Sequence, residues 1–245
     1  MTATKPLGGK GYGSVPHLPC SRLGPGDWSC HEGQARIATE KPRDRHDRII
    51  VTEKLDGSNV CIANVDGAIL AVGRAGYLAQ SSPHRMHQVF AAWVRSQEDR
   101  FRPALEPGQR IVGEWLYQAH GTVYEPVGDP FVPFDLMTGK DRLPWDDACA
   151  AFAAAGLRPA HVVSDGPAIS VAAALAALGP TGRHGAIEEI EGAVWRVERR
   201  GAFDFMAKFV RPSKVDGKYL PGCCGNPPGG GLILFPELTA ALRAA

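Results

Sequence analysis

The sequence predicts an α+β fold built mainly on antiparallel strands. Three observations predict it: short apolar runs of strand length, a tight-turn dipeptide between two of them, and a few helix-like stretches that interrupt the strands. The chain has 245 residues, of which 44% are hydrophobic, so it can bury a core as one large domain. We therefore expect a single catalytic-size domain rather than two small ones.

The first strands follow an abrupt change of pattern at Ile49. Residues 1–48 are rich in Gly, Pro, Arg and His with little periodicity, and we expect an irregular segment packed on the core. From Ile49 the run IIVTEKLDGSNVCIANV and the run GAILAVG are separated by Asp66-Gly67, which favours a tight hairpin turn. The pattern predicts two antiparallel strands.

A helix follows from about His84 to Arg100. Ser82-Pro83 is typical of a helix start, and apolar residues then recur every three or four positions from Met86 to Val94. Four later apolar runs predict strands, and two Ala-rich stretches predict helices. The strand runs are RIVGEWLY, PFVPFDLM, GAVWRVE and DFMAKFV, and the Ala-rich stretches follow Trp145 and Ile169.

We expect the folded domain over residues 49–220. Residues 221–245 form a Gly/Pro-rich tail with room for one short helix at most. No repeat is evident.

Composition excludes a strongly basic nucleic-acid binder. The 27 basic and 26 acidic residues leave a formal net charge of +1, so contact with nucleic acid must come from a local groove. The first residues lack the apolar run of a signal peptide, and no stretch is long and apolar enough for a membrane span. With six cysteines that lack a CxxC pair, we predict free thiols in a cytoplasmic protein rather than a zinc site.

The strongest chemical signal is Glu53-Lys54-Leu55-Asp56-Gly57-Ser58-Asn59, a lysine in a strand-like run followed by a polar turn. Burying an ammonium is costly, and burial or cationic neighbours lower its pKa, which makes lysine a nucleophile. Gly57 permits a close backbone approach, and Asp56 and Asn59 can hold groups around the reacting centre. The alternative is a hairpin edge with a solvated lysine.

Other polar landmarks follow in order within short apolar strands. They are Arg74, Gly113-Glu114, the FVPFD run at 131–135, Glu191-Gly192-Ala193-Val194, and Lys208. This order resembles the covalent nucleotidyltransferase superfamily of polynucleotide ligases and mRNA capping enzymes, whose first motif is Lys-x-Asp-Gly. Its spacing is most similar to the RNA ligase branch typified by phage T4 RNA ligase 2.

The resemblance implies an antiparallel-sheet nucleotidyltransferase core, ATP-grasp-like. Because the chain ends soon after the fifth motif, we expect no carboxyl-terminal OB domain. The resemblance also implies ATP as the cofactor, with AMP covalently bound to Lys54, and Mg²⁺ held by Glu191. Lys208 would neutralise the α-phosphate and depress the pKa of Lys54. The remaining nucleotide ligands would be Glu53, Asp56, Gly57, Asn59, Arg74 on phosphate, Glu114 on the ribose hydroxyls, and Phe134 stacked on adenine.

Each of these roles has a structural alternative. Phe134 could be a core residue, Arg74 could cap a turn, and Glu114 could be a paired structural carboxylate. For Glu191 the alternative is a salt bridge to Arg196 or Arg199.

The sequence departs from the family in its fifth motif, which is usually Lys-x-Lys. Here the positions that alternate with Lys208 are Met206 and Val210, and neither Arg211 nor Lys214 has strand register with Lys208. In the amino-terminal segment a His-Leu-Pro run and Ser21-Arg22 resemble a loop of some bacterial members. We expect Arg22 and Arg211 to contact nucleic acid.

The function implied is an ATP-dependent RNA ligase that transfers AMP to an RNA 5′-phosphate and then seals it to a 3′-OH. Separate end-healing proteins are possible partners, and no membrane is involved. Two alternatives stay open. One is a nucleotide- or RNA-end-binding module of a repair complex that has lost turnover, and the other is a capping-type guanylyltransferase that uses GTP.

Overall fold

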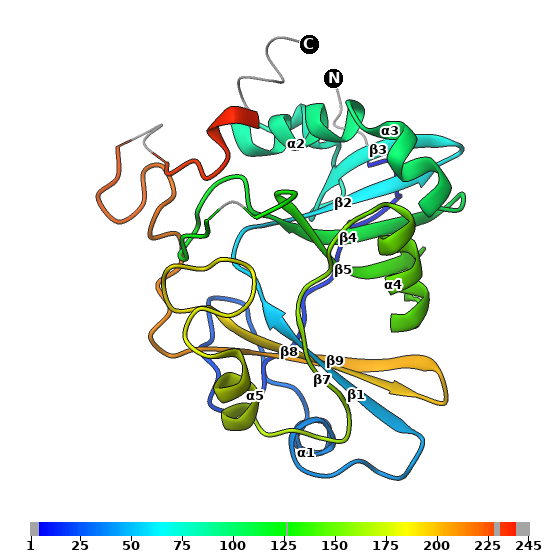
Figure 1. Cartoon of the computed structure of the whole chain (residues 1–245), viewed down its shortest axis with the longest axis vertical. Helices are drawn as coiled ribbons and strands as arrows, with labels where there is room; N and C mark the ends of the chain where they lie inside the picture. Colours follow the sequence, from blue (N-terminus) through cyan, green and yellow to red (C-terminus); the bar gives the residue numbers. More distant parts are fainter. Residues whose placement is uncertain (1–4, 126, 228–230, 239–245) are drawn as a thin grey trace.

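The computed structural model describes residues 5–125, 127–227 and 231–238. It confirms the α+β fold with antiparallel sheets, and Figure 1 shows two sheets stacked one above the other. The lower sheet has the order β7 (Val162–Gly166), β1 (Asp47–Lys54), β8 (Gly192–Arg199) and β9 (Ala202–Val210). The upper sheet has the order β3 (Ala68–Gly73), β2 (Ser58–Val65), β4 (Gln109–Trp115), β5 (Phe131–Thr138) and β6 (Asp141–Arg142).

Helices cover the outer side of each sheet (Figure 1). The upper sheet carries α2 (Arg85–Arg95), α3 (Glu98–Phe101) and α4 (Trp145–Ala154), and the lower sheet contacts α1 (Glu32–Thr39) and α5 (Val171–Leu178). Short 3₁₀ helices occupy Ala79–Ser81 and Arg102–Ala104. The space between the two sheets is thereby left to loops and side chains.

The first apolar run forms two strands rather than the single strand expected. It breaks after Lys54, and β1 and β2 lie in different sheets. A Cβ on Gly57 would come within 2.6 Å of the Trp115 carbonyl oxygen, so only glycine allows this crossing. The hairpin between β2 and β3 is confirmed, with Asp66 and Gly67 both at positive φ.

The amino-terminal segment is less irregular than predicted, because it contains α1. His31 caps this helix by accepting the Gly33 N–H at 3.2 Å, and the Gln34 side chain accepts the His31 N–H at 3.3 Å. Its buried face holds two alanines, Ala35 and Ala38, too small to give a clear helical pattern in the sequence.

Two other boundaries differ from the expected ones. The helix predicted to Arg100 ends at Arg95, and a two-residue turn at Ser96-Gln97 separates it from α3. In the tail, Leu234 is buried and its N–H donates to the Tyr117 carbonyl at 2.9 Å. The structure shows a helical turn at 236–238, and the rest of the predicted tail helix lies outside the described residues.

Aromatic side chains fill the core of the upper sheet. Phe90 and Trp93 of α2 pack on Trp115 and Phe131, with ring centroids 5.1 to 6.2 Å apart. Burying four large rings in one cluster supplies much of the apolar area that holds α2 to the sheet. Among the described residues, no helix combines the length and apolar character needed to cross a membrane.

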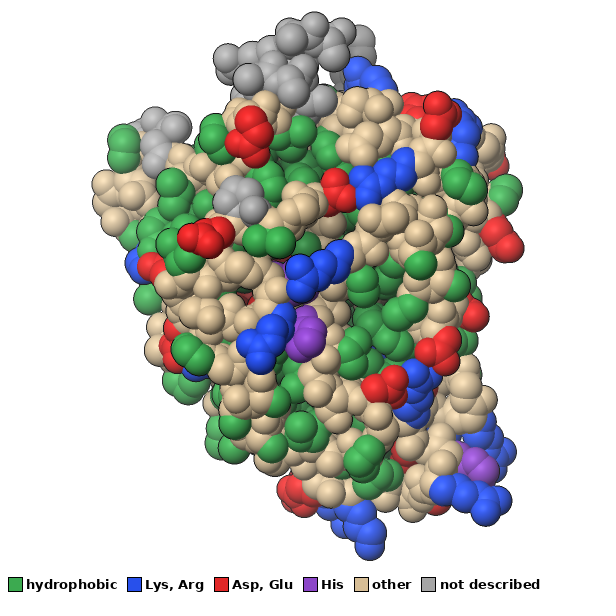
Figure 2. All heavy atoms as spheres, viewed as in Figure 1, with side chains coloured by type: hydrophobic (Ala, Val, Ile, Leu, Met, Phe, Trp, Pro, Cys, Tyr) green, Lys and Arg blue, Asp and Glu red, His purple; other side chains and the backbone are tan. Residues whose placement is uncertain are grey.

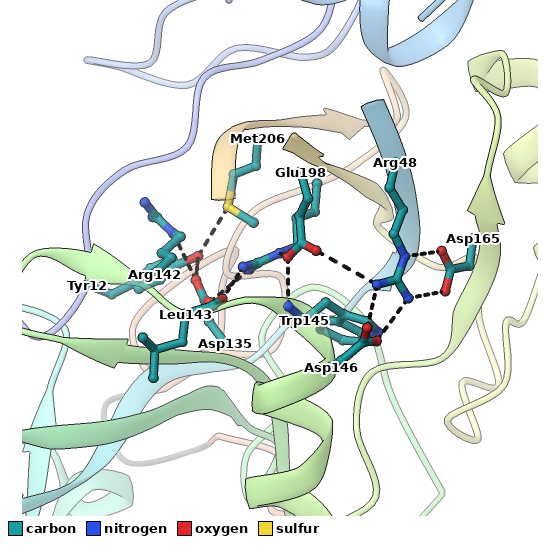
Figure 3. Close-up of polar contacts among 11 residues, drawn as sticks. Tyr12, Arg48, Asp135, Arg142, Leu143, Trp145, Asp146, Asp165, Glu198 and Met206 are labelled. Atoms are coloured by element: carbon teal, nitrogen blue, oxygen red, sulfur yellow. Dashed lines mark hydrogen bonds and ion pairs between the residues drawn. The ribbon is translucent and has the colours of Figure 1, made fainter. Parts of the chain in front are cut away.

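A buried ion network joins the two sheets (Figure 3). Arg196 of β8 donates to Asp135 of β5 at 3.0 Å and to Glu198 at 2.8 Å. Asp135 also accepts from the Tyr12 hydroxyl at 3.0 Å and from Arg142 at 2.8 Å. Because these charges are buried, losing any one would leave another unpaired, so the network fixes the distance between the sheets.

Candidate active site

A cavity of about 860 Å³ lies between the two sheets. Paired residues on neighbouring antiparallel strands share a face, so the register of the lower sheet sets which side chains form its floor. One row pairs Lys54 with Gly192 and Val210, and the next pairs Thr52 with Val194 and Lys208. From the upper sheet the lining residues include Asn59, Glu114 and Phe134.

Lys54 lies at the floor of this cavity, paired with Glu191. Its Nζ lies 2.5 Å from Glu191 Oε2, and its side chain is 19% exposed. Burial alone would lower the pKa of Lys54, but the attraction of Glu191 and Glu114 outweighs burial and the pKa is raised. The attraction of the two carboxylates therefore outweighs the depression of the Lys54 pKa that we expected from Lys208. The two ammonium groups repel each other, and burial and the charge of Lys54 lower the pKa of Lys208.

Glu191 does not form either of the structural salt bridges considered from the sequence. Arg196 binds Asp135 and Glu198, and Arg199 binds two aspartates of the amino-terminal segment. Burial raises the pKa of Glu191, and the positive charge of Lys54 offsets only part of that rise. The carboxylate thus faces the cavity with one cationic partner.

The donor set fits a magnesium ion that is bound mainly through phosphate. Among the described ranges no group of three or more His, Cys, Asp or Glu side chains could hold a metal, and the six cysteines are free thiols. Mg²⁺ keeps several waters and needs only one or two carboxylates when phosphates supply the other oxygens. Glu191 satisfies that requirement.

Glu114 and Asn59 lie side by side across β4 and β2. The Glu114 carboxylate accepts the Gly57 N–H at 3.0 Å, and burial raises its pKa to about 7. Glu114 therefore both supports the turn after Lys54 and borders the cavity. Asn59 Oδ1 is buried and has no hydrogen-bond partner within the described part of the chain, so it can accept a bond from a ligand.

Asp56 contacts Lys214, a residue to which the sequence analysis gave no role in the site. Its Oδ2 accepts the Gly121 N–H at 2.7 Å and forms an ion pair with Lys214. The Lys214 side chain is only 4% exposed and also donates to Thr122 Oγ1 at 3.3 Å. No strand spacing could have revealed Lys214, because it lies on a loop that folds back onto the turn.

The Glu53 carboxylate is turned away from Lys54. It accepts the Arg183 N–H at 2.8 Å, and burial raises its pKa to about 7. Side chains alternate along a strand, so Glu53 and Lys54 face opposite sides of β1. Glu53 borders the cavity, but its carboxylate supports the loop at 182–183.

The two phenylalanines of β5 have different environments. Phe131 is 1% exposed within the aromatic cluster, whereas Phe134 is half-buried and borders the cavity beside Tyr12, with ring centroids 5.5 Å apart. Arg74 is exposed at the cavity edge, and its Nη2 donates to Ser14 Oγ at 3.0 Å. Phe134 and Arg74 are thus both available to a ligand in the cavity.

The two predicted nucleic-acid contacts lie in different places. Arg22 borders the cavity, its N–H donates to the Val210 carbonyl at 2.9 Å, and its guanidinium lies 2.6 Å from Asp216. Arg211 pairs with Glu189 and lines a smaller, separate pocket. The structure brings only Arg22 to the main site.

Two histidines of the cavity wall escaped the sequence analysis. His87 Nδ1 lies 2.9 Å from Ser82 Oγ, and His120 Nε2 lies 3.3 Å from Ser58 Oγ. Burial lowers the pKa of both rings. Neither belongs to a recognisable motif. The tail pairs with residues 117–119, which immediately precede His120.

The fold and the site define an antiparallel-sheet nucleotidyltransferase core. The family model described as RNA ligase matches residues 47–210, and the chain belongs to the RNA ligase family. Among curated proteins no sequence matches this chain.

Solved structures share the fold. An archaeal ATP-dependent RNA ligase superposes with a TM-score of 0.54 at 22% identity, covering 82% of this chain and 48% of the other. A Naegleria gruberi RNA ligase mutant with ATP and Mn gives 0.52 at 14% identity, covering 81% and 60%. An apo mutant of the same ligase gives 0.52 at 15%, covering 83% and 57%. The chain thus spans about half the length of these structures.

Proposed function

We propose that this chain is an ATP-dependent RNA ligase that forms lysyl-AMP at Lys54 and passes the AMP to an RNA 5′-phosphate before sealing to a 3′-OH. The observation that carries the proposal is the contact between Lys54 Nζ and Glu191 Oε2, 2.5 Å long, on the floor of a cavity of nucleotide size. Membership of the RNA ligase family supports RNA as the substrate.

The residues supply what adenylyl transfer requires. Lys54 loses its proton and its Nζ bonds to the α-phosphorus of ATP, while the bond from that phosphorus to the pyrophosphate oxygen breaks. Lys208, on the neighbouring row of the floor, neutralises the α-phosphate, and Phe134 stacks on adenine. Glu191, together with phosphate oxygens, would hold Mg²⁺, which would supply positive charge to the leaving group.

Lys54 must lose a proton before it can attack. Glu191 and Glu114 hold Lys54 as an ammonium ion. A cation held against Glu191 would weaken that attraction and lower the pKa of Lys54, which would make it a usable nucleophile at neutral pH.

Adenylylation tests the proposal. Purified protein incubated with radiolabelled ATP and Mg²⁺ should gain one acid-labile AMP, and Lys54→Ala should abolish the label. GTP and NAD serve as parallel donors. Label from GTP instead would indicate a guanylyltransferase, and no label from any donor would indicate a binding module without turnover, which Val210 in place of a second lysine favours.

Sealing tests the substrate. Enzyme preloaded with AMP should join a 5′-phosphate to a strand that ends in ribonucleotides, because 2′-hydroxyl contacts distinguish RNA from DNA. Faster sealing of an all-DNA nick would contradict the RNA assignment. Normal lysyl-AMP with no joining would point to a missing partner, such as an end-healing protein.

A further inference from the structure

The amino-terminal segment is bonded into the lower sheet next to Lys208. The Leu18 N–H donates to the Lys208 carbonyl at 2.8 Å, and the Lys208 N–H donates to the Pro16 carbonyl at 2.9 Å. On the other side, the His17 N–H donates to the Trp28 carbonyl at 2.8 Å. Because the backbone is bonded along both edges, the His17 side chain has a fixed place on the cavity face of the sheet.

The His17 ring lies between a serine and an aspartate. Nδ1 is 2.7 Å from Ser21 Oγ, and Nε2 is 3.1 Å from Asp27 Oδ2. Ser21 Oγ also accepts the Val210 N–H at 2.9 Å. Ser21 can donate its own proton to Nδ1, an arrangement that puts the ring proton on Nε2, the nitrogen nearer to Asp27. The ring is 1% exposed, and burial followed by the charge of Lys208 lowers its pKa, which keeps it neutral.

Asp27 stands between His17 and Lys208. Its Oδ2 accepts the Gly24 N–H at 3.0 Å, and its Oδ1 lies 3.8 Å from Lys208 Nζ. Burial would raise the pKa of Asp27, but the Gly24 N–H and Lys208 outweigh burial, so the carboxylate stays charged. The other charged groups that act on Lys208 are Lys54, Glu191 and Arg74.

A serine, a histidine and an aspartate can also form a nucleophilic triad. Here Ser21 is not among the residues that border the cavity, whereas His17 and Asp27 are. Ser21 is therefore not placed to attack a substrate in the cavity, and the charged end of this chain of contacts, Asp27, faces Lys208.

We propose that His17 and Asp27 are positioning residues that hold the Lys208 ammonium at the phosphate end of the cavity during nucleotidyl transfer. This inference rests on the proposed function, in which Lys208 neutralises the α-phosphate. A lysine ammonium sits on a flexible four-carbon stem, and a fixed carboxylate beside it restricts its direction. The amino-terminal segment thereby becomes part of the active site.

Two measurements on the intact chain test this proposal. The first needs no nucleotide: acylation of Lys208 by acetic anhydride is followed by mass spectrometry across a range of pH. Asp27→Asn should shift Lys208 acylation to lower pH, because a counterion is lost. Asp44→Asn is the matched control, since Asp44 lies in the same segment but pairs with Arg199, and neither borders the cavity.

The second measurement is the single-turnover rate of lysyl-AMP formation. Asp27→Asn and His17→Leu should slow it by roughly 10- to 100-fold, as expected when a catalytic group is misplaced, with little change in the KM for ATP. His17→Gln should retain more of the rate, because its amide keeps a polar group with N–H donors beside Asp27. Asp44→Asn should leave the rate unchanged.

Unchanged Lys208 acylation and an unchanged rate in Asp27→Asn would overturn the proposal. Asp27 is partly exposed, so this near-isosteric change should fold, and a thermal melt verifies that it does. If the wild-type chain forms no lysyl-AMP, the proposed function fails together with the role in transfer. The acylation experiment still decides whether Asp27 holds Lys208.

Discussion

Lys214 forms a buried ion pair with Asp56, the acidic residue of the turn that follows Lys54. Asp56 borders the main cavity, whereas Lys214 borders the smaller pocket. We therefore expect this lysine to support the turn rather than to contact the nucleotide. The second lysine that is usual in the fifth motif is missing from β9. Lys214 lies nearby, but its ammonium group is already paired with Asp56.

Lys214→Met should destabilise the fold, because it leaves the Asp56 carboxylate buried without its cation. Breaking one side of a buried pair costs about 3 to 5 kcal/mol, which a urea titration would resolve. Lys218→Met is the control, since Lys218 pairs with Glu188 at the surface and such pairs contribute about 0 to 1 kcal/mol. Equal losses in both variants would contradict the assignment.

Glu191→Ala should weaken metal-dependent adenylylation while leaving the chain folded, because in the proposed function this carboxylate would hold the cation. The rate of lysyl-AMP formation would be measured against Mg²⁺ concentration. Glu189→Ala, which alters a nearby carboxylate paired with Arg211 outside the cavity, should keep wild-type metal dependence. Full activity together with a lowered melting temperature would show that Glu191 is structural.

Phe134→Ala should raise the KM for ATP by roughly tenfold, since stacking on a base is worth about 1 to 3 kcal/mol. The same change at Phe131 should act on stability instead. Phe131 is buried among Phe90 and Trp93, and truncating such a residue costs about 3 to 5 kcal/mol. The KM for ATP and the free energy of unfolding would be measured for both variants. A change in ATP binding in Phe131→Ala alone would contradict these two roles.

Arg22→Ala should slow lysyl-AMP formation, because Arg22 is bonded beside Val210 at the cavity wall. Adding Val210→Lys should restore part of the rate, since residue 210 lies in the same row of the floor as Lys54. Arg211→Ala, which faces the separate pocket, should have little effect on this step. No rescue by the lysine would mean that Arg22 acts on something other than the phosphate.

Glu53 makes stability depend on pH. Burial raises the folded pKa of Glu53 to about 7, well above the ordinary value of a glutamate. The stability it contributes is therefore complete below the unfolded pKa and is lost as pH rises through about 7. Glu53→Gln keeps an acceptor for the Arg183 N–H without the charge. Urea titrations should show a gain over wild type above neutral pH, at most roughly 3 kcal/mol by linkage, and none near pH 4.

The strands β4, β5, β8 and β9 were predictable because each is a short apolar run with its own local signal. The hairpin at Asp66-Gly67 was equally local. The break after Lys54 was not, because the strand pattern continues through Leu55 and only the Trp115 backbone against Gly57 requires the crossing. Helix α1 was missed because its buried residues are alanines.

By itself the sequence determined the order of the motifs, and with it the family, because each motif is a short contiguous run. Tertiary structure alone decided how their charges combine. The pKa of Lys54 is raised because Glu191 and Glu114, far away in the chain, converge on it. Likewise Lys214 reaches Asp56 and Asp27 reaches Lys208 only after folding, since electrostatic interactions depend on distance in space and not on separation along the chain.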